Sequence, residues 1–256
     1  MRPLIMITND DGVGAKGLQA LVSVARNIGD VVVMAPSKNS SGLAHSFTGG
    51  QPLRVNIISE EKDCKVYSCE GTPVDCVKIC EQFFCERRPN IVLSGINHGS
   101  NASINVLYSG TMGAVMEASA NGLNAIGFSL LDHDEDADFT LSLPFVRIII
   151  EAVLKKSLPD GVSLNVNIPV VSDGVIKGIR LCRESRACWK DSYVKRIDPQ
   201  GRPYYWLTGR FECNDNGDDT DQGALENGYV SVVPTTTDYT AYKEFDIIRN
   251  DYGELF

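Results

Sequence analysis

The feature that most constrains this chain is the alternation, from residue 4 to residue 168, of short apolar runs with segments of helical spacing. The apolar runs have the length of buried strands, and the segments between them repeat apolar residues every three or four positions. Strands are expected at residues 4–7, 31–35, 91–93, 125–128 and 164–168, and helices at 18–28, 72–85, 110–122 and 139–155. The sequence therefore predicts an α/β fold of Rossmann-like type, a mostly parallel sheet with helices on both faces.

The residue pattern of the sequence changes after about residue 180. Aromatic and polar residues mix there with turn signals such as Asp198-Pro199-Gln200-Gly201, a pattern typical of β-hairpins. We expect a Rossmann-like core over residues 1–180, with residues 181–256 forming a C-terminal hairpin and tail as an appendage of the same domain. Aromatic rings on a two-stranded hairpin need a surface to pack against, which is either the hairpin's own sheet or a neighbouring subunit.

Net charge and composition exclude some classes of partner. The formal net charge is -9 and the sequence pI is about 4.9, so the basic footprint typical of proteins that bind polymeric nucleic acid is missing. No apolar run reaches the ~18 residues of a membrane span, and the N-terminus passes straight into a strand without a secretory signal. We therefore expect a cytoplasmic protein without a membrane partner. A small phosphorylated ligand is compatible with an acidic chain if a divalent metal supplies positive charge locally.

Two adjacent aspartates, Asp10 and Asp11, follow directly after the first predicted strand. In open α/β sheets, ligands bind beyond the carboxyl ends of the strands. Adjacent carboxylates repel each other unless a positive group lies beside them, and Mg²⁺ or Mn²⁺ prefers such oxygen ligands. The alternative is that the pair caps the following helix, where acids are also favoured. The pair alone does not decide between a metal site and a helix cap.

The next residues, Gly12-Val13-Gly14-Ala15-Lys16-Gly17, match the dinucleotide fingerprint G-x-G-x-x-G. The two aspartates before them would repel a cofactor pyrophosphate. The second strand also ends in Ala35-Pro36-Ser37, without the acid that would hold a ribose. We interpret the glycines as positions of tight turning and close packing, and not as a dinucleotide site.

Three further polar segments follow a predicted strand or begin a predicted helix. Residues 35–46 include Ser41 and His45, and residues 94–101 include Asn97 and Asn101. Ser109-Gly110-Thr111 opens a helix, where hydroxyls and backbone N–H groups form a natural phosphate cradle. Because the carboxyl ends of parallel strands meet at one edge of a sheet, these segments can converge with the two aspartates.

Taken together and in order, these segments resemble the signature of the SurE (survival protein E) family. The likeness rests on Asn9-Asp10-Asp11-Gly12, residues 35–46, Glu70-Gly71-Thr72-Pro73, Ser94-Gly95-Ile96-Asn97 and Ser109-Gly110-Thr111. It continues through residues 165–169, 201–206 and 228–231, and so covers nearly the whole chain. The resemblance implies a metal-dependent phosphatase, a 5′-nucleotidase that hydrolyses nucleoside 5′-monophosphates. Many members of the family also hydrolyse 3′-monophosphates, and some trim short polyphosphate.

The resemblance also implies a role for individual residues. The metal ligands would be Asp10, Asp11, Ser41 and Asn97, with the two aspartates also catalytic and one Mg²⁺ or Mn²⁺ bound per subunit. The phosphate contacts would be Asn101, Ser109, Gly110 and Thr111. Ser41 is chosen over Ser40 because it lies four residues before His45, the spacing expected in the family. His45 would contact the phosphate or protonate the leaving oxygen, or else be structural. Family members form homodimers, or homotetramers, by exchanging C-terminal elements.

The chemistry expected from these residues is metal-assisted phosphoryl transfer to water. Whether Asp10 acts as nucleophile, as base or only as ligand is left open by the sequence. An aspartyl-phosphate phosphatase of the haloacid dehalogenase type is one rival, but that class has one residue between its two aspartates, which are adjacent here. A non-catalytic nucleotide or metal sensor on the same scaffold is the rival from another class. Turnover of a nucleoside monophosphate separates an enzyme from a sensor.

Overall fold

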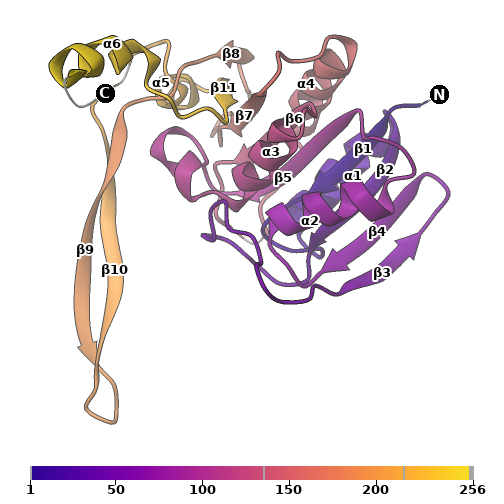
Figure 1. Cartoon of the computed structure of the whole chain (residues 1–256), viewed down its shortest axis with the longest axis horizontal. Helices are drawn as coiled ribbons and strands as arrows, with labels where there is room; N and C mark the ends of the chain where they lie inside the picture. Colours follow the sequence, from indigo (N-terminus) through magenta and orange to yellow (C-terminus); the bar gives the residue numbers. More distant parts are fainter. Residues whose placement is uncertain (1, 135, 216, 254–256) are drawn as a thin grey trace.

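The fold is built around one large sheet (Figure 1). The computed structural model describes residues 2–134, 136–215 and 217–253, and nine strands within these residues form the sheet. In spatial order they are β3 (Val55–Glu60), β4 (Cys64–Cys69), β2 (Asp30–Pro36), β1 (Leu4–Thr8), β5 (Ile91–His98), β6 (Ala125–Leu130), β7 (Val162–Ile168), β11 (Val230–Thr236) and β8 (Ile179–Leu181).

The middle of this sheet is parallel. β4, β2, β1, β5, β6 and β7 pair in parallel register, with Ile5 opposite both Val31 and Ile91. β3 and β11 run antiparallel to their neighbours β4 and β7, and β8 is parallel to β11. The five strands predicted from apolar runs are all present. Their side chains are buried along nearly the full length of each strand, as expected for a sheet covered on both faces.

Helices cover both faces of the sheet, as predicted. α1 (Lys16–Arg26) and α4 (Leu143–Lys155) pack on one face, where Leu21 and Ile150 are fully buried. α2 (Pro73–Ile79), its continuation η1 (Cys80–Phe84) and α3 (Gly110–Ala120) pack on the other. The mostly parallel, Rossmann-like α/β fold expected from the sequence is therefore confirmed.

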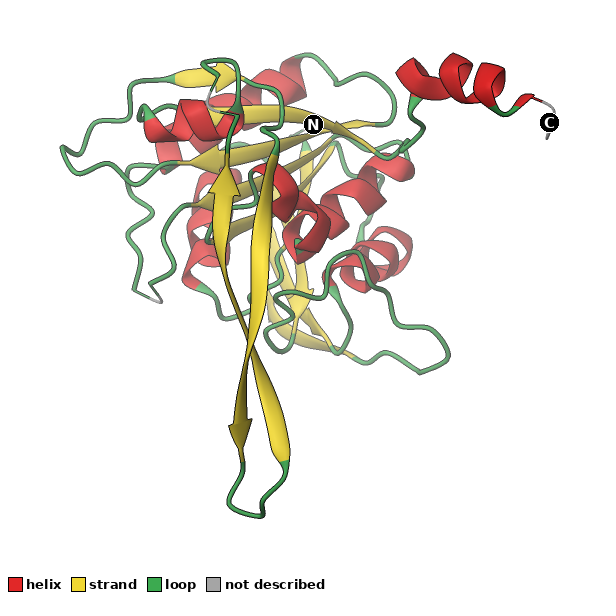
Figure 2. Ribbon diagram, turned by 90° about the vertical axis from the view of Figure 1, so that its left-hand side faces the viewer, coloured by secondary structure: helices red, strands yellow, loops and turns green. Residues whose placement is uncertain are grey.

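The C-terminal part adds a projecting ribbon and two helices. β9 (Ala187–Ile197) and β10 (Pro203–Cys213) form an antiparallel hairpin that extends away from the body in both views (Figures 1 and 2). After it come α5 (Asp221–Glu226), strand β11 of the central sheet, and α6 (Tyr242–Asp251). Figure 2 shows α6 apart from the rest of the body, and none of its residues is buried.

Some local predictions were wrong or incomplete. The helix expected at 139–155 begins at Leu143, because the Ser142 hydroxyl bonds to the Phe139 carbonyl in a turn before Pro144. Strands β3 and β4 were not predicted. Phe83, which lies in the helix predicted at 72–85, is 76% exposed because α2 changes to the wider η1 turn at Cys80. No helix in the described part of the chain is long and apolar enough to cross a lipid bilayer.

Candidate active site

The two aspartates lie at the carboxyl end of β1, next to the carboxyl end of β5. Asn9 shapes the turn that carries them, because its side-chain nitrogen donates to the Gly12 carbonyl and its oxygen accepts from the Gly12 N–H. Ser40 donates its backbone N–H to the Asp10 carbonyl at 2.7 Å. The loop after β2 is thereby held against the loop after β1.

Asp10 is a buried carboxylate with a hydroxyl partner. Its side chain is 4% exposed, and Oδ1 accepts a hydrogen bond of 2.6 Å from the Thr111 hydroxyl. Burial raises the pKa of Asp10, the Thr111 hydrogen bond opposes this rise, and the charge of Asp11 adds to it. The described residues include no ion-pair partner for Asp10. A buried carboxylate beside a second one is costly to ionise unless a cation is supplied.

Gly110 lets α3 approach Asp10. A Cβ atom at this position would lie 2.8 Å from the Asp10 Cβ and 2.9 Å from its Oδ2. Any larger residue would therefore push the start of α3 away from the carboxylate. The absence of a side chain at Gly110 brings the first backbone turn of α3 directly to Asp10.

Asp11 makes two side-chain contacts at the same edge. Ser41 donates its hydroxyl to Asp11 Oδ1 at 3.3 Å, and His98 Nδ1 lies 3.3 Å from Oδ2. The His98 ring also packs edge-on against Phe139, with centroids 5.1 Å apart. Sequence analysis assigned no role to His98, but its side chain is only 17% exposed. It is a missed neighbour of the aspartate pair.

The donor set fits a hard divalent cation. Asn97 is 8% exposed and donates its side-chain nitrogen to the Gly99 carbonyl, while no donor among the described residues bonds to its Oδ1. Asp10, Asp11, Ser41 and Asn97 thus offer carboxylate, hydroxyl and amide oxygens, the ligands that Mg²⁺ and Mn²⁺ take. The described residues hold no cluster of three or more His, Cys, Asp or Glu suited to a metal. A cation here would depend on the hydroxyl and amide as well as the carboxylates.

Ser109, Gly110 and Thr111 form the start of α3. The Ser109 hydroxyl caps the helix by accepting the Met112 N–H at 3.0 Å. This leaves other N–H groups of the first turn without a helical partner, which is the usual setting for a bound anion. Because Thr111 also bonds to Asp10, the helix start and the aspartate pair form one continuous site.

Asn101 sits in a buried network of amides. Its backbone N–H donates to Asn167 Oδ1 and its side-chain nitrogen donates to the Ser129 hydroxyl, both at 2.8 Å. Asn165 donates to the Asn101 carbonyl, and Asn167 donates to Asn165 Oδ1. Asn165 and Asn167 were used in sequence analysis only as part of a family signature. The alternation of polar with apolar residues in β7 was the signal that they share one face.

His45 lies against the first turns of α3, at Gly113. A Cβ atom at Gly113 would lie 2.8 Å from the Ala44 carbonyl and 3.1 Å from the His45 Cα, so this loop packs directly on the helix. Burial lowers the pKa of His45, and a hydrogen bond to the backbone of Val106 only partly offsets this. The ring's Nε2 is buried without a partner among the described residues. His45 is therefore held largely as neutral imidazole.

A surface cleft opens beside Asp11. Its lining includes Lys16, Lys38 and His133 as well as His98. The cleft therefore brings lysine and histidine side chains to the wall that Asp11 forms, with the Lys16 ammonium paired to Asp136. His133, which sequence analysis did not connect with the site, packs against Gly99 at the end of β5.

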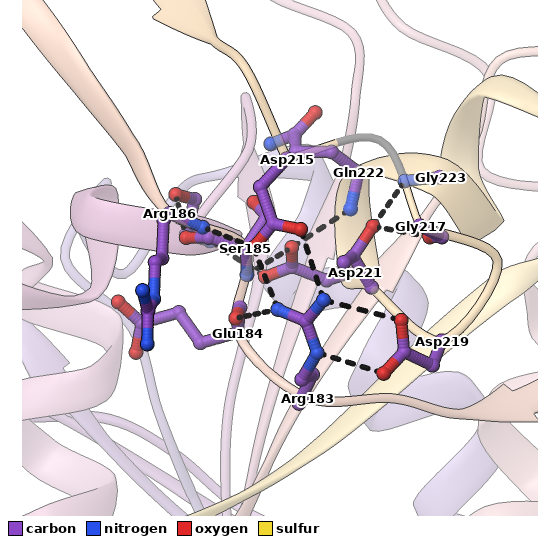
Figure 3. Close-up of polar contacts among 12 residues, drawn as sticks. Arg183, Glu184, Ser185, Arg186, Asp215, Gly217, Asp219, Asp221, Gln222 and Gly223 are labelled. Carbon is purple, nitrogen blue, oxygen red and sulfur yellow. Dashed lines mark hydrogen bonds and ion pairs between the residues drawn. The ribbon is translucent and has the colours of Figure 1, made fainter.

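The base of the hairpin is tied to the segment before α3. The buried Asp221 carboxylate accepts the backbone N–H of Ser103 at 2.7 Å and that of Ser185 at 3.0 Å. Figure 3 shows the neighbouring Arg183 bonded to both Asp215 and Asp219. Ser103 begins η2 (Ser103–Tyr108), which leads directly into Ser109. The hairpin and the start of α3 are therefore fixed to the same short segment.

Comparison with known proteins agrees with this geometry. The family model described as "Survival protein SurE" matches residues 5–191. The chain belongs to the SurE family. It is 49% identical over 250 residues to a protein named 5′-nucleotidase SurE from Flavobacterium psychrophilum, covering 97% of each chain. A protein of the same name from Flavobacterium johnsoniae is 53% identical, with 94% of this chain and 93% of that one covered.

A solved structure matches as well. The SurE protein of Aquifex aeolicus has a TM-score of 0.83 and 36% sequence identity, and the match covers 97% of this chain and 99% of that one. The SurE fold is therefore shared over nearly the full length.

The structure shows what the last glycine of residues 12–17 does. A Cβ atom at Gly17 would lie 1.9 Å from the Ile96 carbonyl oxygen, so this glycine permits α1 to pack on β5. Gly17 therefore serves close packing, as the sequence analysis proposed, whereas a Cβ atom at Gly14 would meet nothing within 4 Å.

Proposed function

We propose that this chain is a metal-dependent phosphomonoesterase that hydrolyses nucleoside 5′-monophosphates to nucleoside and phosphate. The observation that carries the proposal is the hydrogen bond between Asp10 and Thr111, which joins an acidic pair suited to a divalent cation to a helix start suited to a phosphate. The name 5′-nucleotidase carried by relatives near 50% identity supports the same reaction. Nucleoside 3′-monophosphates and short polyphosphate are proposed as further substrates.

The metal would be one Mg²⁺ or Mn²⁺ per subunit, held by Asp10, Asp11, Ser41 and Asn97. When bound, it would supply positive charge that polarises the phosphoryl oxygens and acidifies the attacking water. Without a cation, Asp10 is a buried acid whose raised pKa reflects the cost of its charge. The site residues thus have the chemistry that such a cation would complement.

The phosphate would rest on the first turn of α3. The Ser109 hydroxyl, the backbone of Gly110 and the Thr111 hydroxyl would balance charge on the equatorial oxygens. Asn101 would add a donor, since its side-chain nitrogen carries two hydrogens and Ser129 takes only one. The Asn165 and Asn167 amides would hold Asn101 in that position.

Two groups are proposed to move or hold protons. The Thr111 hydroxyl bonds to Asp10 Oδ1, and the carboxylate keeps further lone pairs for reaction or for ligation of the metal. His45, largely neutral and with Nε2 unpaired within the described chain, lies over the same helix start. It would hydrogen-bond the phosphate or the leaving oxygen as an auxiliary residue.

The experiment that tests this function is turnover. Purified protein is incubated with 5′- and 3′-nucleoside monophosphates and short polyphosphate, each with Mg²⁺ or Mn²⁺, and released phosphate is measured. We expect release from 5′-monophosphates in the presence of metal. Nucleotide binding without release under all of these conditions would instead support the alternative, a nucleotide or metal sensor on the same scaffold.

A further inference from the structure

A hollow lined by aromatic and polar side chains lies next to the start of α3. It has a volume of about 430 Å³, within the range of small-molecule sites. Its lining residues are Tyr108, Trp189, Asp191, Leu207, Thr208 and Gly209. Tyr108 is the last residue of η2, and the next residue is Ser109, the cap of α3. Tyr108, which lines the hollow, is therefore the residue directly before the proposed phosphate contacts.

The indole ring in this hollow is held in place from two sides. Trp189 donates its Nε1 hydrogen to Asn105 Oδ1 at 2.8 Å, and Asn105 belongs to η2. The ring also packs edge-on against Phe211, with centroids 5.5 Å apart. The Asp221 bonds to Ser103 and Ser185 hold η2 and the base of the hairpin together below it. Trp189 thus has a fixed position relative to Ser109.

One side of the hollow is lined by a glycine and an acid. Gly209 is paired with Asp191 across the hairpin, so both residues belong to the same face of the ribbon. A Cβ atom at 209 would lie only 2.8 Å from the Lys190 carbonyl oxygen. Asp191 has no ion-pair or hydrogen-bond partner from its carboxylate among the described residues. Its two oxygens accept hydrogen bonds and repel a phosphate.

We infer that this hollow is the nucleobase subsite of the enzyme. The inference rests on the proposed function and names the part of the substrate that the start of α3 does not bind. A nucleoside monophosphate carries an uncharged, flat, aromatic base on the far side of its sugar. That base would stack on the rings of Tyr108 and Trp189, as bases do on aromatic side chains. The N–H groups on its edge would donate to Asp191.

The chemistry of Asp191 favours guanine among the bases. Guanine presents a ring N–H and an exocyclic amine side by side, and these two donors match the two oxygens of one carboxylate. Inosine keeps the ring N–H and lacks only that amine. Guanosine should therefore bind more tightly than inosine, and Asp191 should be the cause of the difference.

The test measures binding of nucleosides, which carry no phosphate. Isothermal titration calorimetry with guanosine should give a Kd about tenfold higher for Trp189→Ala than for the unchanged protein, the scale of one lost base stack. Trp189→Phe keeps a stacking ring but loses the bond to Asn105, so most of the affinity should return. Phe83→Ala removes an exposed ring outside the hollow and should leave the Kd unchanged. Binding of inorganic phosphate should be the same in all four proteins.

Asp191→Ala provides a second variant that spares the packing of the hairpin. It should abolish the preference for guanosine over inosine, because it should raise the Kd for guanosine, which has two donors for Asp191, more than the Kd for inosine, which has one. An unchanged Kd for guanosine in Trp189→Ala, or equal losses of guanosine and phosphate binding, would overturn the inference.

These outcomes are separable from failure of the proposed function. If the chain hydrolyses no phosphate ester, the turnover experiment fails whatever the calorimetry reports. If it hydrolyses nucleotides but Trp189→Ala binds guanosine normally, the phosphatase assignment stands and the base lies elsewhere.

Discussion

The Thr111 hydroxyl donates a hydrogen bond of 2.6 Å to the Asp10 carboxylate, linking two buried side chains that are 101 positions apart in the sequence. Asp10 follows the first strand, and Thr111 lies in the first turn of α3. A change in the charge of Asp10 therefore changes the hydrogen bond that holds Thr111 at the start of α3. The proposed metal ligands and phosphate contacts should consequently behave as one unit in mutational tests.

The first prediction concerns the charges of the aspartate pair. Asp10→Asn and Asp11→Asn each remove one negative charge at nearly constant shape. Each should lower turnover by about a hundredfold or more, the scale seen when one group that stabilises a transition state is lost. Thermal unfolding without metal should be unchanged or shifted upward, because the two carboxylates repel each other when no cation is bound.

Asp160→Asn is the matched control for that prediction, since Asp160 is exposed in the turn before β7. It should keep full turnover. Near-normal turnover in both Asp10→Asn and Asp11→Asn would mean that the pair takes no part in catalysis; a helix-cap role is already excluded, because α1 begins at Lys16 with Ala15 as its N-cap.

The second prediction concerns metal removal. Chelation should abolish phosphatase activity, and Mg²⁺ or Mn²⁺ should restore it. Because a ligand that binds only the folded state stabilises it, added metal should also raise the unfolding temperature of the unchanged protein. The same metal should have little effect on Asp10→Asn. Full activity in a preparation verified to be free of metal would contradict the proposed ligand set.

Much of the fold was predictable because its strands are buried on both faces. The runs at β1 and β2 are apolar over several consecutive residues, so they predict strands without any information about the strands beside them. The start of α2 was also predictable, because Thr72 and Asp75 form a capping box and Pro73 is a first-turn proline. By contrast, β3 is an edge strand with exposed positions, so it carries no continuous apolar run.

The sequence predicted which loops form the candidate site, but it did not predict the contacts between their side chains. Parallel topology makes the ends of β1 and β5 neighbours, which brings Asp10 and Asn97 to one edge. The contact of His98 with Asp11 depends on the packing of Phe139 from a distant loop, which no local pattern reveals. The support of Asn101 by Asn167 likewise depends on strand register across β6.

The third prediction concerns that support. Asn167→Leu removes the oxygen that accepts the Asn101 backbone N–H, leaving a buried donor unpaired at a cost of about 1–3 kcal/mol. If Asn101 contacts phosphate, inorganic phosphate should inhibit this variant about tenfold more weakly, as expected when a residue that orients a ligand is lost. Both unfolding in urea and inhibition by phosphate should be measured.

Ser163→Ala separates positioning from general stability. Ser163 is buried on the same strand and bonds to Thr235 at 2.7 Å, away from Asn101. Its loss should destabilise the protein without changing inhibition by phosphate. If the two variants weaken phosphate binding equally, Asn167 has no specific role in positioning Asn101.

The fourth prediction concerns pH and the loop that carries His45. Burial works to raise the pKa of Asp75, but hydrogen bonds from Thr48 and Thr72 prevail and hold that pKa below its usual value. The stability that Asp75 contributes is therefore present at neutral pH and is lost as pH falls through its folded-state pKa. Asp75→Asn should lower the free energy of unfolding by about 1–3 kcal/mol at pH 7. The difference from the unchanged protein should shrink below about pH 4, and urea unfolding at pH 7 and pH 3.5 tests this directly.

The last prediction is that the chain forms a homodimer or homotetramer through its C-terminal part. The hairpin exposes large side chains along its length, with Tyr193 68%, Tyr205 59% and Trp206 62% exposed. On α6, Phe245 is 55% and Ile248 47% exposed, and the helix buries no residue against its own chain. Exposed aromatic and aliphatic residues on projecting elements are typical of interface cores. Isolated two-stranded ribbons are also marginal in water unless they pack against something.

Light scattering at micromolar concentration should give at least twice the chain mass of 27.9 kDa. Replacing Phe245 and Ile248 together with serine, or Tyr205 and Trp206 together with serine, should weaken assembly. The proposed metal ligands lie on the central sheet and its loops, so metal binding per chain should persist in these variants. Ile148→Ser, which alters a 55% exposed position on α4, serves as the matched control and should not change the mass. A stable, fully active monomer would show that these rings are simply tolerated in water, and it would leave the proposed site on the central sheet intact.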